Sequence, residues 1–165
     1  MIWFISDTHF SHFKILEYCD RPFKDAQEMN RALIDNWNRC VKPDDTIYNL
    51  GDFAWGKIDE IEKILSRLNG HKHLILGNHD KEIIKHQQRL LDKNLFESIQ
   101  YYKEINLEGQ LIVLFHYGMR RWNKSHYGSI MLYGHSHSKL PPYGKSMDIG
   151  VDSQVITTEY RPISI

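Results

Sequence analysis

Nine polar side chains of the kinds that bind metal ions follow short apolar segments in this sequence. The first apolar segment, residues 2–5, leads into Asp7 and His9, and four later segments end in a similar way. The set contains three carboxylates, one amide and five imidazoles: Asp7, His9, Asp52, Asn78, His79, Asp80, His116, His135 and His137. Together these ligand types suit borderline divalent ions such as Mn, Fe, Zn, Ni or Co. If the groups converge, two metal ions would remove the cost of burying like charges and unpaired polar atoms.

Glycine directly precedes three of these sites, at Gly51, Gly77 and Gly134. A residue without a Cβ permits a sharp exit from a strand and a close approach of the backbone. Each motif alone has an ordinary explanation, because Gly-Asp is commonly a turn and Gly-Asn-His-Asp can be a turn with an Asx cap. A single histidine at a strand end is usually a hydrogen-bonded core or surface residue. The five motifs in this order, each after an apolar segment, favour one shared site.

The elements that must position these residues follow from hydrophobic periodicity. Short apolar segments predict strands at residues 2–6, 46–50, 73–76, 111–115 and 130–133. Helical spacing predicts a short piece at residues 13–18 and amphipathic helices at 25–39, 58–68 and 81–93, the first of them capped by Asp25 with Glu28 three residues on. Weaker patterns predict a half-exposed strand at residues 99–105, a hairpin turn at Glu108-Gly109, and strands at 146–151 and 155–165. Strands alternating with helices, and then following one another, indicate a layered α/β fold whose strand ends bind ligands.

Composition limits the class of protein. A length of 165 residues predicts one domain, residues 1–165, and 21 basic residues balance 21 acidic ones. This balance argues against a dedicated nucleic-acid binder and shows no strong nucleic-acid-binding signature, although metals could still supply charge for a nucleotide substrate. No apolar segment approaches the ~18–20 residues of a membrane span, and no basic leader precedes the first strand, so we expect a cytoplasmic protein. Cys19 and Cys40 are expected to be reduced thiols. The oligomeric state stays open.

The ordered motifs resemble the signature of the calcineurin-like metallophosphoesterases, in the form of the small single-domain bacterial and phage members. The resemblance rests on Asp7-x-His9, Gly51-Asp52, Gly77-Asn78-His79-Asp80, His116 and Gly134-His135-x-His137. It implies a four-layer α/β/β/α sandwich of two mixed sheets flanked by helices. It also implies two divalent metal ions, manganese first, with Fe, Zn, Ni or Co as alternatives. One ion would be bound by Asp7, His9 and His137, the other by Asn78, His116 and His135, with Asp52 bridging them.

The resemblance further implies a phosphoesterase. A hydroxide bound at the two metals would attack phosphorus, and His79, steadied by Asp80, would assist the leaving group as a general acid. We expect a phosphodiester or nucleotide substrate, because a short chain leaves little room for a lid. Three alternatives stay open: a phosphomonoesterase of the same fold, a non-catalytic scaffold for a protein partner, and a zinc amidohydrolase.

The sequence departs from the large eukaryotic phosphatases of this family after Asp52. Phe53-Ala54-Trp55-Gly56 stands where those enzymes have Asp-Arg-Gly, so no arginine is supplied there to bind substrate phosphate. Substrate-binding candidates are therefore sought elsewhere. Arg120, Arg121 and Trp122 could hold a phosphate and stack a base, and His12 could line the cleft. The alternative is that residues 117–129 form a solvated loop whose tryptophan packs on the domain.

Overall fold

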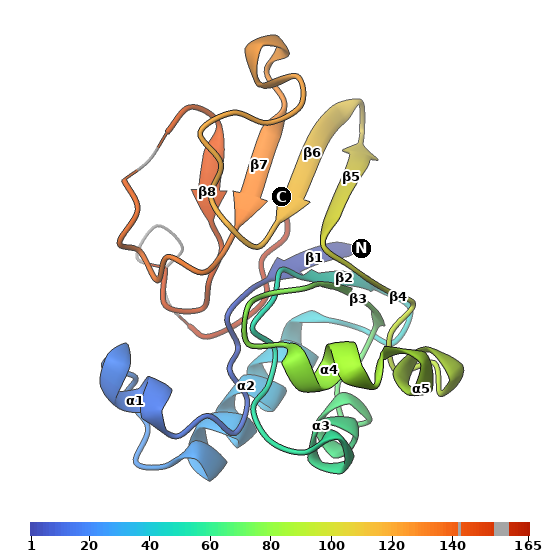
Figure 1. Ribbon diagram of the computed structural model, residues 1–165, viewed down its shortest axis with the longest axis vertical. Helices are drawn as coiled ribbons and strands as arrows, with labels where there is room; N and C mark the ends of the chain where they lie inside the picture. Colours follow the sequence, from blue (N-terminus) through green and yellow to red (C-terminus); the bar gives the residue numbers. More distant parts are fainter. Residues whose placement is uncertain (142, 154–158) are drawn as a thin grey trace.

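Two four-stranded sheets and five helices make up the protein, as described by a computed structural model for residues 1–141, 143–153 and 159–165 (Figure 1). The first sheet contains β1 (Ile2–Ile5), β2 (Thr46–Asn49), β3 (His71–Ile75) and β4 (Ser98–Gln100). The second contains β5 (Tyr102–Leu107), β6 (Gln110–Phe115), β7 (Ile130–Tyr133) and β8 (Ser146–Asp148). The helices are α1 (Lys14–Tyr18), α2 (Ala26–Cys40), α3 (Ile58–Leu65), α4 (Lys81–Lys85) and α5 (Gln87–Asp92), and a 3-10 turn, η1, spans Ser125–Tyr127.

The first sheet is built from successive β-α-β units. Its strands are parallel in the order β1-β2-β3-β4, and Phe4 adds an antiparallel bridge to Ile163. Parallel strands need crossover connections, and α2, α3 and the α4–α5 pair supply them. Figure 1 shows these helices gathered on one side of the sheet. All four strands therefore end at one edge.

The second sheet begins with a hairpin. β5 and β6 are antiparallel and are joined at Glu108 and Gly109, whose φ values are 51° and 86°. Two positive φ angles are what a type I′ turn requires, so the predicted hairpin is confirmed. The strands β6, β7 and β8 are parallel to one another, so two sequence-distant strand ends, at His116 and Gly134, lie at one edge.

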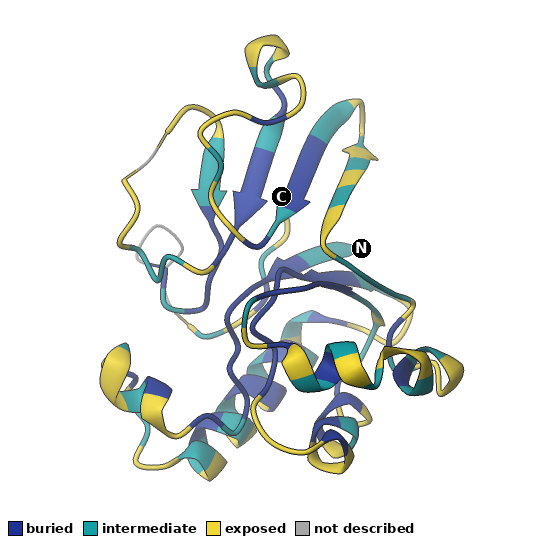
Figure 2. Cartoon of the chain, in the orientation of Figure 1, coloured by how far each residue is buried: buried dark blue, intermediate teal, exposed yellow. Residues whose placement is uncertain are grey.

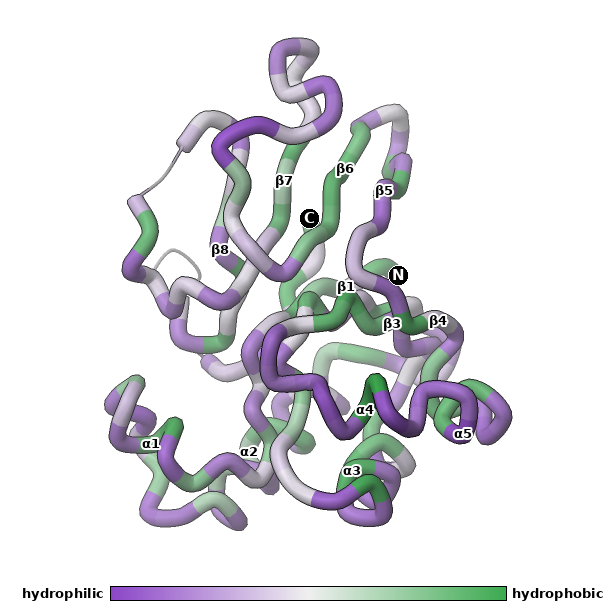
Figure 3. The backbone as a smooth tube through the Cα atoms, in the orientation of Figure 1, coloured by the Kyte–Doolittle hydropathy of each residue, from purple (hydrophilic) through white to green (hydrophobic). Residues whose placement is uncertain are grey.

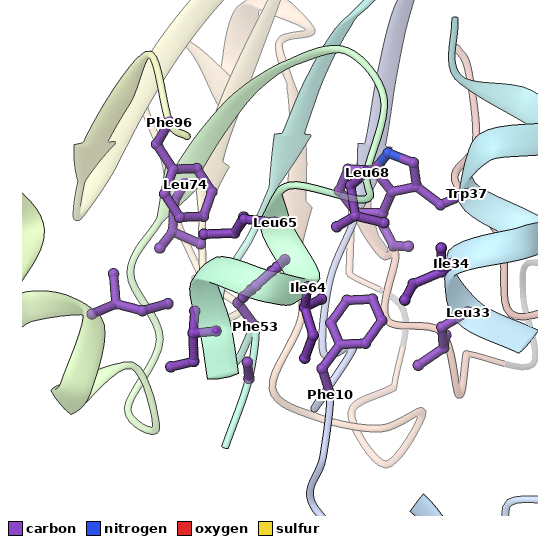
Figure 4. Close-up of a cluster of buried hydrophobic side chains, with 14 of the residues drawn as sticks. Phe10, Leu33, Ile34, Trp37, Phe53, Ile64, Leu65, Leu68, Leu74 and Phe96 are labelled. Carbon is purple, nitrogen blue, oxygen red and sulfur yellow. The ribbon is translucent and has the colours of Figure 1, made fainter. Parts of the chain in front are cut away.

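Three apolar clusters fill the layers, and alternation along the strands assigns side chains to them. In β1, Ile5 packs towards the helices whereas Phe4 packs between the two sheets. Figure 2 shows most of β6 and β7 as buried, whereas β5 alternates between exposed and intermediate residues, and Figure 3 shows β6 and β7 as hydrophobic. Figure 4 shows the helix-side cluster, in which Trp37 of α2 is 1% exposed. Burying one large apolar side chain of this kind stabilises the fold by about 1.5–3 kcal/mol.

The outer face of the second sheet is covered by a loop. Val113, Met131 and Tyr133 point outward from β6 and β7 and pack with Trp122, which lies in the loop between these strands. In the described part of the chain the loop contains only the η1 turn, so it takes the place of the flanking helix expected there. The layered α/β fold of two packed sheets is otherwise as expected.

Helix boundaries follow local capping. The Asp25 carboxylate accepts a hydrogen bond of 2.8 Å from the Glu28 backbone N–H, and α2 begins at the next residue, as predicted. The carboxylate of Glu28 turns back to the Lys24 backbone N–H at 2.7 Å. Gly70, with φ +90°, ends the α3 region, where a Cβ would lie 2.7 Å from a methyl group of Val41.

Four predicted elements differ from the structure or lie partly outside the described residues. Residues 99–105 form parts of two strands, because Ile99 packs with the helix-side cluster and Ile105 packs between the sheets, with an exposed Tyr101 separating them. The helix predicted at 81–93 is interrupted at His86, whose backbone (φ −118°, ψ 20°) leaves the helical region. The strand at 146–151 is shortened to β8. Of the predicted strand at 155–165, residues 155–158 lie outside the described residues, and Ile163 forms a single bridge.

Candidate metal centre

The carboxyl ends of strands from both sheets meet at one place. Backbone hydrogen bonds join the loops there, from Asp7 N–H to the Gly51 carbonyl at 3.0 Å and from His9 N–H to the Asp52 carbonyl at 2.9 Å. The Asp7 carboxylate accepts the backbone N–H of His135 at 2.9 Å, which ties the end of β1 to the end of β7. Residues more than a hundred positions apart are thereby brought side by side.

Asp7, His9 and His137 form a first group of possible metal ligands, with one donor atom each within 4.8 Å of the others. The Nε2 atoms of His9 and His137 lie 4.0 and 3.9 Å from Asp7 Oδ1. Asp7 and His9 are buried and His137 is half-buried. This is the trio that the sequence assigns to one ion.

Asp52, His116 and His135 form a second group. His116 Nε2 lies 3.1 Å from the Asn78 side-chain oxygen, which brings the amide into the same group. Asp52 Oδ2 lies 3.6 Å from His116 Nε2 and also 3.6 Å from His9 Nε2. One carboxylate oxygen is therefore equally near a histidine of each group, which is the position that a bridging ligand needs.

The chemistry of these groups fits divalent cations. Within the described residues the buried Nε2 atom of His9 has no hydrogen-bond partner, and burial lowers the pKa of His9 far below its usual range. Burial, reinforced by the nearby Asp52, raises the pKa of Asp7 from 3.8 to about 7. Buried imidazole and carboxylate groups facing one another without counter-charge are costly, and a bound cation would remove that cost.

Hydrogen bonds behind the imidazoles fix which nitrogen faces the centre. The Nδ1–H of His116 donates a hydrogen bond to the Leu50 carbonyl at 2.7 Å, so Nε2 is the nitrogen whose lone pair can bind a metal ion. The Nδ1–H of His137 donates to Asp152 at 2.8 Å, and Arg21 holds the same carboxylate through two bonds of 2.7 and 2.9 Å. Metal-binding histidines commonly have such partners, which set the tautomer and ring orientation.

The groups around His137 raise its pKa although the ring is half-buried. Burial would lower the pKa of His137, but the hydrogen bonds to Asp152 and Cys19 and the charge of Asp7 together raise it to about 10. Cys19 and Cys40 are free thiols, as expected. The Cys19 sulfur lies 3.4 Å from His137 Nδ1.

The backbone is strained at these positions. Asp7, His9, Asp52, His135 and His137 have φ values of 56°, 49°, 53°, 65° and 44°, in the left-handed region that residues with a side chain rarely adopt. Each such residue costs about 1–3 kcal/mol, and strain of this kind collects at functional sites. Among the described residues these five account for five of the twelve non-glycine residues with positive φ, which supports a site at the strand ends.

The glycines next to the candidate ligands leave no room for a side chain. A Cβ on Gly77 would lie 2.3 Å from Asp52 Oδ1, and one on Gly134 would lie 2.2 Å from Asp7 Oδ2. A Cβ on Gly51 would lie 2.5 Å from the Nδ1 atom of His116. The close backbone approach expected at these glycines is present.

His79 and Asp80 follow the same strand but have different surroundings. His79 is exposed at the rim, its backbone N–H donates to Asp52 Oδ1 at 2.8 Å, and its ring lies 5.6 Å from that of His9. Asp80 is fully buried and accepts three backbone N–H groups, from Asp52, Phe53 and Gly77, at 2.9, 2.9 and 2.7 Å.

These contacts correct the expected partnership of His79 and Asp80. Among the hydrogen bonds of the described residues, none joins the Asp80 carboxylate to the His79 ring. Burial raises the pKa of Asp80 to about 6, and its three N–H partners oppose that rise only in part. Asp80 therefore holds two loops together beneath the site, while His79 faces outward.

An aromatic rim borders His79. The ring of His12 stacks on Trp55 at 4.6 Å and lies 5.4 Å from the ring of His9, so His12 is beside the candidate metal centre as expected. Trp55 is 48% exposed, and its ring lies 5.7 Å from His79. Beside these rings is a hollow of about 390 Å³ lined by Ala54, Trp55, Gly56, His79, Lys81 and Glu82.

Arg120, Arg121 and Trp122 do not join this constellation. Trp122 is buried against the second sheet and its Nε1–H donates to the Ser129 carbonyl at 3.1 Å, so it cannot stack on a base at the centre. Arg120 and Arg121 line a separate hollow with Tyr143. The alternative considered above, a loop whose tryptophan packs on the domain, is correct for Trp122.

Three buried or half-buried residues organise the site but were not predicted from the sequence: Arg21, Asp148 and Asp152. Arg21 is 4% exposed and donates to the backbone carbonyls of Asp7 and Thr8 as well as to Asp152. Asp148 accepts from the Ser138 backbone N–H at 3.0 Å and so holds the loop after β7. The only signal for Asp148 was an acidic residue within an otherwise apolar predicted strand.

None of the helices described is both long and apolar enough to span a bilayer.

Comparisons with known proteins agree with this fold. The model of the calcineurin-like phosphoesterase superfamily domain matches residues 1–149. An uncharacterized protein of Methanocaldococcus jannaschii is 34% identical over 173 residues, covering 99% of this chain and 86% of that protein. A protein of unknown function from Aquifex aeolicus has a solved structure that is 29% identical with a TM-score of 0.73, covering 99% of this chain and 94% of its own. A solved archaeal phosphodiesterase, at 20% identity and TM-score 0.54, covers 92% of this chain and 83% of its own and shares the fold.

Proposed function

Because the chain belongs to the calcineurin-like phosphoesterase superfamily, a metal-dependent family of phosphoester hydrolases, we propose that residues 1–165 act as one catalytic domain that hydrolyses a phosphodiester or nucleotide-type substrate. Asp7, His9 and His137 would hold one divalent ion, and Asn78, His116 and His135 the other, with Asp52 shared between them. Manganese is the first choice of metal because carboxylate, amide and imidazole donors suit it.

The observation that carries this proposal is the position of Asp52. Its Oδ2 atom lies 3.6 Å from a histidine nitrogen of each ligand group, and its other oxygen, Oδ1, accepts the His79 backbone N–H. One buried carboxylate thus connects both ligand groups to the residue that we assign to the leaving group. When bound, two metal ions would supply Lewis-acid stabilisation of the phosphate and lower the pKa of a water molecule.

The proton needed by the leaving group is assigned to His79. The ring of this histidine lies at the exposed rim, next to His9 and Trp55, and borders the hollow of about 390 Å³. A general acid in such a position contributes roughly 10²–10⁴-fold to rate. Trp55 offers an aromatic wall, so the hollow suits a leaving group with an aromatic ring or base. Lys81 and Glu82 line the same hollow.

A diester is favoured over a monoester because the segment that follows Asp52 supplies no basic side chain. The segment after Asp52 contributes Phe53, Ala54 and Trp55, and none of these can hold the second charge of a phosphomonoester. The runner-up is a phosphomonoesterase of the same fold, and beyond catalysis a metal-binding scaffold for a protein partner.

Hydrolysis of bis(p-nitrophenyl) phosphate with added Mn²⁺ tests the proposal, with p-nitrophenyl phosphate as the monoester comparison. Asp52→Asn should lose bound metal and turnover together. His79→Ala should retain metal and lose turnover by 10²-fold or more. His71→Ala, which changes an exposed histidine on β3, is the matched control and should behave as the wild type.

Two results would overturn the proposal. Absence of turnover with each of Mn, Fe, Ni, Co and Zn would leave the scaffold as the better interpretation. Loss of metal from His79→Ala would show that the role assigned to His79 is wrong.

A further inference from the structure

The zero net charge of the chain conceals a long segment without acidic residues. Between Glu108 and Asp148 the sequence contains no aspartate or glutamate, whereas it contains five basic residues: Arg120, Arg121, Lys124, Lys139 and Lys145. The equal totals of 21 basic and 21 acidic residues therefore arise from unlike parts of the molecule. In Figure 3 the loop leading into β7 is hydrophilic beside the hydrophobic strands.

Three of these cations converge on one hollow. Arg120, Arg121 and Lys145 line a concavity of about 590 Å³ together with His126 and Tyr143. Neither arginine forms an ion pair with any residue that the structure describes. Tyr143 is 51% exposed, so an aromatic surface lies beside the unneutralised charges.

The hollow is supported by a fixed base. Trp122 packs against the second sheet between the two arginines and the strands, and a Cβ on Gly144 would lie 3.4 Å from its ring. The Ser129 hydroxyl donates to the Asn123 carbonyl at 2.5 Å, which closes the loop behind Trp122. Side chains mounted on a packed base lose less conformational freedom when they bind a ligand.

A short segment joins one side of the hollow, at Arg120, to the candidate metal centre, whereas His126 and Lys145 precede β7 and β8 at the opposite ends of these strands. The ring of Tyr117 lies 4.9 Å from that of His116 and 4.7 Å from that of His135. Two residues lie between Tyr117 and Arg120, so the Cα atoms of these two residues are at most about 11 Å apart. A ligand that occupies both places must therefore carry phosphates at more than one position.

We infer that the hollow of Arg120, Arg121 and Lys145 binds the backbone of a single-stranded oligonucleotide whose neighbouring phosphodiester lies at the metal centre. Arginine pairs with phosphate through parallel N–H bonds, and an exposed tyrosine offers a stacking face to any base. The substrate class rests on the proposed function, but binding in this hollow does not require turnover. Mononucleotides are too short to use both places.

The test is binding of a fluorescein-labelled oligothymidylate of about 12 nucleotides, within the usual ~4–16 nucleotide site size, followed by anisotropy in excess EDTA. The variant Arg120→Ala/Arg121→Ala/Lys145→Ala should bind at least tenfold more weakly at low salt. The slope of log K against log salt should fall in magnitude by about 2, because each neutralised phosphate of a single strand contributes ~0.7.

A matched control removes the same charge from the helices. Arg31, Lys63 and Lys85 are exposed on α2, α3 and α4, and replacing all three with alanine should leave affinity close to that of the wild type. Turnover of bis(p-nitrophenyl) phosphate by the control variant Arg31→Ala/Lys63→Ala/Lys85→Ala should equal that of the wild type.

The outcomes separate the two proposals. Equal weakening by both triple variants, or no oligonucleotide binding by the wild type, overturns the inferred site. Oligonucleotide binding without any phosphodiester turnover overturns the proposed function and leaves the binding site supported.

Discussion

The imidazole of His137 is held on one side and faces the candidate metal centre with the other. Its Nδ1–H donates to Asp152, and its Nε2 lies 3.9 Å from Asp7 Oδ1. Arg21 in turn fixes Asp152 and donates to the Asp7 carbonyl at 2.7 Å. One buried guanidinium thus positions both ends of a ligand pair, although it does not itself point at the centre.

Asp152→Asn should weaken metal binding and also lower the stability of the fold, because the buried Arg21 loses its counter-charge. The amide keeps the size of the side chain but loses the charge that orients His137 and balances Arg21. Changes behind a metal ligand typically cost 10–100-fold in metal affinity, and we expect that range for Mn²⁺ measured by calorimetric titration. Asp35→Asn, at an exposed position on α2, is the control. Unchanged affinity in Asp152→Asn would show that this hydrogen bond is irrelevant to the centre.

Asp80→Ala should destabilise the protein rather than act only on turnover. Three backbone N–H groups would lose their buried acceptor, and each unsatisfied group costs about 1–3 kcal/mol. We expect a loss of roughly 3 kcal/mol or more in urea unfolding, measured with chelator throughout. His79→Ala, at an exposed position, should change stability by no more than about 0.5 kcal/mol. Equal stability of the two variants would contradict the structural role of Asp80.

The nine residues singled out in the sequence each follow an apolar strand, and the structure gathers seven of them into two groups of possible ligands, with Asp80 beneath these groups and His79 at their rim. The sequence reasoning missed Arg21, Asp148 and Asp152, since these act through other side chains and their partners are distant in sequence. The prediction for Trp122 was wrong. An aromatic residue beside two arginines is typical of a ligand-binding loop, but the ring of Trp122 packs on the apolar outer face of the second sheet.

At the scale of elements, strong periodicity was a better guide than weak alternation. α2 has both a buried stripe and a capping residue, and its start agrees with prediction. The apolar residues at 99–105 keep one alternating pattern although Ile99 and Ile105 belong to different sheets. The alternation alone therefore could not show where the chain passes from the first sheet to the second. A single non-helical residue, His86, likewise leaves the side-chain pattern of residues 81–93 intact.

Helices α3 and α5 are joined by a network of exposed charges. The Glu62 carboxylate accepts from Arg89 at 2.7 and 2.8 Å and from Lys93 at 2.8 Å, and the hydrogen bond from Arg89 is the main cause that lowers the pKa of Glu62. A lowered carboxyl pKa stabilises the fold above the unfolded value near 4.5, and this stabilisation is lost as pH falls.

Glu62→Gln should therefore cost about 1 kcal/mol or less at pH 7, since solvent screens the pairs. The difference from the wild type should shrink below pH 4 and in 1 M salt. Urea unfolding at pH 7 and pH 3.5 measures this, with Glu17→Gln on α1 as the control. A difference that persists in acid would mean that packing, not charge, explains the loss.

At the scale of the whole molecule, the two sheets meet so that buried acids from the first sheet face histidines from the second. Asp7 and Asp52 are 0% and 2% exposed, and the charge of Asp52 adds to the cost of ionising Asp7. The junction of the two sheets is therefore a site where a bound cation would offset buried negative charge. Binding of a cation there should raise the free energy of unfolding.

Manganese should raise the thermal midpoint, and more at pH 8 than at pH 6. Burial raises the pKa of Asp7 to about 7, so the folded chain holds a proton that the unfolded chain releases near pH 4. That contribution to stability is lost as pH rises through 7, which is also where the carboxylate becomes free to bind a cation.

A metal at 100 times its Kd adds about 2.7 kcal/mol, or roughly 5–10 °C for a chain of this size. Scanning fluorimetry with and without Mn²⁺ at both pH values measures the shift, and Asp7→Asn should abolish it while Asp35→Asn should not. An equal shift at both pH values would contradict proton competition at Asp7, and no shift at all would contradict the metal centre itself.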